Sequence, residues 1–138
     1  MKFTLFYKDY SFKPTLSAMK EFKESTGKDL WASLMGYISV YTSCAKSTDK
    51  NVADMLILLA DVLDFVEAAQ LFYCLAKQEN NSLTLQEIED AMFHAGILKN
   101  NEAGNKAEPY TIVLYQLALQ INEYHNQLHS EKKPKASS

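Results

Sequence analysis

The chain has 138 residues with a formal net charge of −3, and 47% of them are hydrophobic, a composition typical of one globular domain. With only four glycines and three prolines, it lacks the frequent turn signals that a many-stranded β-sandwich or barrel requires, so helices are favoured. All fourteen basic residues are lysines, and the absence of arginine together with the acidic balance argues against nucleic-acid binding.

Cysteine usage and hydropathy predict a soluble protein of a reducing cytoplasm. Cys44 and Cys74 lie thirty positions apart without a C-x-x-C motif, which is typical of reduced core cysteines. Lys8 and Asp9 interrupt the beginning of the chain, so we expect no secretory signal. The longest apolar stretch, residues 52–69, contains four acidic residues, and we therefore expect no membrane-spanning helix.

The first segment, residues 2–13, alternates apolar and polar side chains. This alternation predicts a short hairpin that turns at Lys8 and Asp9 and ends before Pro14. Next, Thr15 is placed to cap a helix that Gly27 ends.

Asp29 is placed to cap the following helix, whose apolar residues recur at helical spacing. We expect Trp31, the only tryptophan, to anchor the core. The polar run 45–51 predicts a loop, and residues 51–77 predict helix with a break near Asp64.

The segment 65–76, FVEAAQLFYCLA, is apolar at ten of twelve positions. A helix that is apolar nearly all round is either central in the fold or half covered by a partner. We prefer the central position, but the partner interpretation stays open. It leads to the hypothesis of an exposed stripe that holds a client or a second copy, formed by Phe65, Leu71, Phe72 and Tyr73.

The segment 82–98 predicts another capped helix, in which Thr84 and Glu87 form a capping box and Gly96 is the stop. A polar loop is expected at 99–108. The last helix is expected to begin near Pro109, and residues 130–138 to form a disordered basic tail. The sequence thus predicts a mainly α, single-domain bundle over residues 1–129, with five to six helices and a short N-terminal β-hairpin.

No constellation of residues predicts catalysis, a metal or a cofactor. Glu87, Asp90 and His94 share one helix face and could present three metal ligands, but a solvated face explains the same spacing. His125 and His129 are one turn apart but lack the glutamate of a zinc hydrolase motif. We therefore expect a protein without enzymatic activity.

Three segments carry a resemblance to a known family: P-T-L at 14–16 followed by T-G-K-D-L at 26–30, the apolar run LILLA at 56–60, and LTLQEI at 83–88. In these segments and their order, over about residues 1–98, the chain resembles the tail assembly chaperones of long-tailed, lambda-like bacteriophages and the related small proteins of gene transfer agents. The resemblance implies a helical, non-enzymatic protein of the host bacterial cytoplasm. Such a protein binds the tape measure protein, prevents its aggregation, helps the tail tube assemble, and is absent from the mature virion.

The family also commonly makes a longer product by ribosomal frameshifting near the end of the short reading frame. Lys132 and Lys133 lie where a slip on lysine codons would occur, although a solubilising basic tail explains them equally. Self-association is a further expectation, because large apolar patches usually mark interfaces. The competing interpretation is an unrelated small helical regulatory or adaptor protein.

Overall fold

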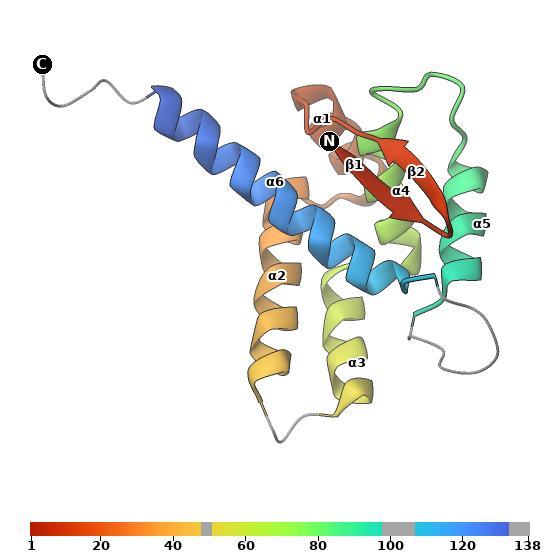
Figure 1. Cartoon of the computed structure of the whole chain (residues 1–138), viewed down its shortest axis with the longest axis vertical. Helices are drawn as coiled ribbons and strands as arrows, with labels where there is room; N and C mark the ends of the chain where they lie inside the picture. Colours follow the sequence, from red (N-terminus) through yellow and green to blue (C-terminus); the bar gives the residue numbers. More distant parts are fainter. Residues whose placement is uncertain (48–50, 98–106, 133–138) are drawn as a thin grey trace, which may run out of the picture.

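The computed structural model describes residues 1–47, 51–97 and 107–132 (Figure 1). It is 70% helical, with six helices in the described part and one N-terminal hairpin, which confirms the predicted fold class. The elements are β1 Lys2–Leu5, β2 Lys8–Ser11, α1 Leu16–Thr26, α2 Leu30–Lys46, α3 Val52–Val62, α4 Phe65–Ala76, α5 Leu85–Ala95 and α6 Tyr110–Lys132. None of these helices is long and apolar enough to cross a bilayer.

The hairpin is present, but its turn differs from the prediction. Strands β1 and β2 pair antiparallel with Leu5 opposite Lys8, so the loop consists of Phe6 and Tyr7 and not of Lys8 and Asp9. Both loop residues have positive φ, 46° and 66°, as a two-residue turn requires when it must match the twist of the strands. This register places Phe3 and its neighbours Leu5, Tyr10 and Phe12 in the core.

The predicted helix starts are confirmed by cap geometry. Thr15 Oγ1 accepts a hydrogen bond from the Ala18 amide at 3.1 Å, and Asp29 Oδ2 accepts one from the Ala32 amide at 2.7 Å. Gly27 ends α1 in the left-handed conformation, with φ 76°, as predicted. Helix α2 continues to Lys46, so the first residues of the expected loop 45–51 are helical.

The break near Asp64 separates α3 from α4. Asp64 and Glu67 form a reciprocal capping box, with Glu67 N donating to Asp64 Oδ1 at 2.8 Å and Asp64 N donating to Glu67 Oε1 at 3.0 Å. Lys28 Nζ joins the two helices by donating to Val62 O at 2.7 Å and to Glu67 Oε1 at 3.0 Å. The corner is therefore fixed by local hydrogen bonds.

Helix α4 is the central helix of the fold, as preferred from its composition. Leu71 and Phe72 are 0% exposed, and the Phe72 ring lies 4.9 Å from that of Phe3. The expected exposed stripe is therefore wrong for these two residues, because the hairpin and the helices around α4 cover them. Phe65 and Tyr73 are half-buried and pack against the same core.

Helices α5 and α6 complete the bundle. Thr84 Oγ1 accepts from the Glu87 amide at 3.2 Å, but the Glu87 carboxylate pairs with Lys8 Nζ at 2.6 Å, so only half of the predicted capping box forms. Helix α6 runs to Lys132, which corrects the expected disorder at 130–132. Lys133 and most of the predicted loop 99–108 lie outside the described residues.

Trp31 packs against the core, as expected, but from its edge. It is half-buried at the surface, where its ring lies 4.5 Å from that of His125 on α6. The large buried aromatic residue of α2 is Tyr37, which is 1% exposed. Burial, with the nearby Tyr110 and Tyr41, raises the Tyr37 pKa well above its ordinary value.

Candidate partner-binding site

Helices α2 and α3 form an antiparallel pair that we call the α2–α3 arm. The C-terminal half of α2 and the N-terminal half of α3 extend below α6 in Figure 1, away from the hairpin and α5. The two helices approach closely at Gly36, where an added Cβ would lie 3.3 Å from Val62 Cγ1. The arm is therefore a packed helical hairpin.

Helix α3 is unusual because its composition and its burial disagree. All of its eleven residues except Asp54 and Asp61 are apolar, yet Leu59 is the only fully buried one. Met55, Leu56 and Val62 are half-buried. The apolar residues exposed to solvent are Val52, Ala53, Ile57, Leu58 and Ala60.

The helical repeat divides α3 into two apolar faces. Met55, Leu59 and Val62 share the face that packs against the core. Ala53, Leu56, Ile57 and Ala60, at positions i, i+3, i+4 and i+7, share a second face that we call the α3 stripe. Ile57 at its centre is 68% exposed.

An exposed apolar residue alone requires no explanation, because more than half of a folded surface is apolar. The α3 stripe differs because its four residues follow one helix face without a polar interruption. Because Ile57 is already about one-third covered, a partner that covers the rest gains about two-thirds of the full burial of such a side chain, or about 1–2 kcal/mol. Helix-in-groove recognition uses anchors at this i, i+3, i+4, i+7 spacing.

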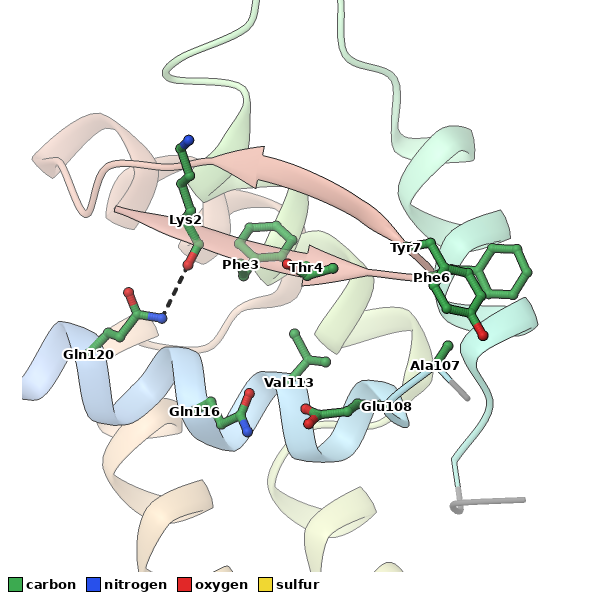
Figure 2. A pocket seen from close by; sticks show the side chains of 10 residues that line it. All are labelled: Lys2, Phe3, Thr4, Phe6, Tyr7, Ala107, Glu108, Val113, Gln116 and Gln120. Carbon is green, nitrogen blue, oxygen red and sulfur yellow. Dashed lines mark hydrogen bonds between the residues drawn. The ribbon is translucent and has the colours of Figure 1, made fainter. Parts of the chain in front are cut away.

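A cavity of about 430 Å³ lies between β1 and α6 and is the second candidate (Figure 2). Gln120 Nε2 donates to Lys2 O at 3.2 Å across it, so a side chain of α6 satisfies part of the unpaired edge of β1. Figure 2 shows the Lys2 amine pointing away from α6 and from Glu108, the only carboxylate in the lining. Because the Lys2 amine and the Glu108 carboxylate do not meet, they form no charged binding site. We interpret the cavity as the gap left where α6 covers the edge of β1.

A second cavity, of about 390 Å³, lies where α6 passes the start of α2 and is the third candidate. Its lining is mainly apolar, and Trp31 and His125 meet there. The ring of His129 lies 4.3 Å from that of His125, and both histidines are exposed. The aromatic contacts hold α6 against α2.

The predicted polar face of α5 is engaged with neighbouring side chains. Glu87 pairs with Lys8. Burial, together with the nearby Glu87 carboxylate, raises the Tyr10 pKa to about 12. Asp90 accepts a hydrogen bond from Gln86 Nε2 at 2.9 Å. The His94 ring lies 5.2 Å from that of Phe6. In the described ranges, no three histidine, cysteine, aspartate or glutamate side chains gather as a metal site.

Sequence reasoning missed the α3 stripe, although a signal was present. The apolar stretch 52–69 contains helix α3 and the beginning of the central helix α4, and the partner hypothesis was stated for residues of α4 alone. In α3, apolar residues stand on both sides of the Asp54 and Asp61 positions, and this pattern indicates a second apolar face.

Comparison with known proteins identifies no relative. No family model, no curated protein and no solved structure matches this chain.

Proposed function

We propose that this chain is a non-enzymatic binding protein that covers an apolar helix of a partner with its α3 stripe. The observation that carries the proposal is the eleven-residue helix with nine apolar residues, of which only Leu59 is fully buried. Following the resemblance of the chain, we propose that the partner is the tape measure protein and that the chain is a tail assembly chaperone. In that role it acts in the bacterial cytoplasm and leaves before the virion is complete.

The proposed mechanism is the temporary burial of apolar surface. Long apolar helices aggregate because association removes their surface from water. The α3 stripe offers a competing helix face, with Ile57 in its centre and the small Ala53 and Ala60 at its ends. Small residues at the ends allow two helix backbones to approach, so that Ile57 reaches between the client side chains. Such contacts are reversible, and assembly of the tail tube can displace them.

The test is co-expression with the tape measure protein of the same genome, followed by measurement of the soluble tape measure fraction. The native chain is expected to raise that fraction, and Ile57→Glu is expected to abolish the effect because it places a charge in the contact. Leu16→Glu on α1 is the matched control, because Leu16 is 65% exposed and Ile57 is 68% exposed. Circular dichroism verifies that both variants are folded.

The outcomes separate the proposal from an unrelated adaptor. If the native chain leaves the tape measure protein insoluble, the chaperone function is wrong. If Ile57→Glu protects as well as the native chain, the site is wrong.

A longer product is a separate expectation for a tail assembly chaperone. Expression with an N-terminal tag and the downstream DNA is expected to give a minor band whose peptides continue in another frame after Lys132 and Lys133. An adaptor requires no such product.

A further inference from the structure

We propose that the partner segment is an amphipathic helix with lysine or arginine along one side of its apolar face. This inference rests on the proposed function and specifies the chemistry of the client. It follows from the charges beside the α3 stripe. Asp54 and Asp61 are seven positions apart, so they stand in one row with Leu58, immediately beside the stripe.

Both carboxylates are available to a partner. Asp54 and Asp61 are exposed, and within the described part of the chain neither side chain has an ion-pair or hydrogen-bond partner. Helix α3 contains no basic residue. Lys28, near its C-terminal end, is paired with Glu67. The one charged residue of α2, Lys46, ends that helix on the side of the arm where α3 begins, and it forms no ion pair with Asp54. Within α3, both charged residues of the row beside the stripe are therefore acidic and unpaired.

This acidic row favours a basic partner over a second copy of the chain. In an antiparallel two-fold contact between α3 stripes, the same surface occurs on both sides, and the row of one copy would face the row of the other. Opposed like charges disfavour such a contact. A client helix with cations in register would place each of them against Asp54 or Asp61.

The experiment uses two synthetic helical peptides of about 18 residues, which is long enough for a stable helix. They share one leucine and alanine face, but the flanking positions are lysine in one peptide and glutamate in the other. Fluorescence anisotropy with the full chain measures both affinities at about 50 mM and 300 mM salt, because surface pairs weaken as screening increases. We expect the lysine peptide to bind about tenfold more tightly at low salt, as two exposed pairs allow.

Variants locate the effect. Asp54→Asn with Asp61→Asn is expected to remove the preference for lysine while retaining binding of both peptides. The charge-matched control is Glu24→Gln with Glu123→Gln, two exposed carboxylates on α1 and α6. Ile57→Ser is expected to weaken both peptides equally.

Each result distinguishes the two proposals. Equal binding of the two peptides overturns the inference and leaves the proposed function standing. A lysine preference that the control pair removes as well also overturns it, because the net charge of the chain then explains the preference. If neither peptide binds, the stripe holds no helix and the proposed function fails.

Discussion

The burial pattern of α3 predicts opposite results for two substitutions that are two residues apart. Leu59 is 1% exposed and Ile57 is 68% exposed. Leu59→Ala removes three buried carbon groups at about 0.8 kcal/mol each, and the cavity raises the expected cost to about 3–5 kcal/mol. Ile57→Ala loses only a third of the burial of one side chain, and alanine gains helix propensity, so the change is expected to stay within about 0.5 kcal/mol.

Urea denaturation followed by circular dichroism measures this difference. With a slope of about 2 kcal/mol per molar urea, Leu59→Ala is expected to lower the midpoint by about 1.5–2.5 M, and Ile57→Ala by less than about 0.3 M. The measurement is repeated at two protein concentrations, because a midpoint that depends on concentration reveals association. A loss of several kcal/mol for Ile57→Ala would refute the reasoning, since it would mean that the α3 stripe is buried in the free protein.

Three further predictions follow from the caps, the turn and the core. Asp64→Ala removes the capping box at the start of α4 and is expected to lower the free energy of unfolding by about 1 kcal/mol, measured in urea. Replacing Phe6 and Tyr7 by Asn and Gly relieves two left-handed residues, so thermal melts are expected to show stabilisation of about 1–2 kcal/mol. Burial, with the nearby Glu21, raises the Cys74 pKa from 9.0 to about 11. The buried, protonated Cys74 thiol therefore contributes fully to the free energy of unfolding below pH 9, and this contribution is lost as the pH rises to 11. The urea midpoint of the native chain is expected to fall across that range, and that of Cys74→Ala is expected to fall less.

Much of the fold was predictable because its signals are local. Thr15, Asp29 and Thr84 are short polar side chains before amphipathic stretches, and each one caps a helix in the structure. The alternation of residues 2–13 predicted the strands because one face of the hairpin is buried. The loop position was predicted wrongly because Phe6 and Tyr7 are not among the residue types, such as Asn, Asp and Gly, that usually form such turns. Lys8 and Asp9 are two adjacent polar residues that interrupt the alternation, and this interruption indicated a turn.

The candidate site was not predictable in the same way, because composition does not encode the order in which helices pack. Phe72 and Ile57 are both apolar residues of apolar helices, and only the packing of the hairpin over α4 makes one of them core. The α3 stripe can be identified as an exposed apolar face only when the residues that cover each helix are known. Partner binding and core formation are both driven by the burial of apolar surface, so the sequence pattern alone does not distinguish a core face from a partner-binding face.

The close approach of α2 and α3 at Gly36 has a kinetic consequence for the partner binding that we propose. A segment that folds only on contact loses conformational entropy at that moment, and this loss weakens the complex. The α2–α3 arm is already packed, with the Gly36 backbone against Val62, so the relative position of its two helices is set before any encounter. Recognition then requires no rearrangement of the arm, and the rate of association is governed by collision and orientation. A bulkier residue at position 36 would separate α2 from α3. The surface of the α2–α3 arm would then have to become ordered before it could bind.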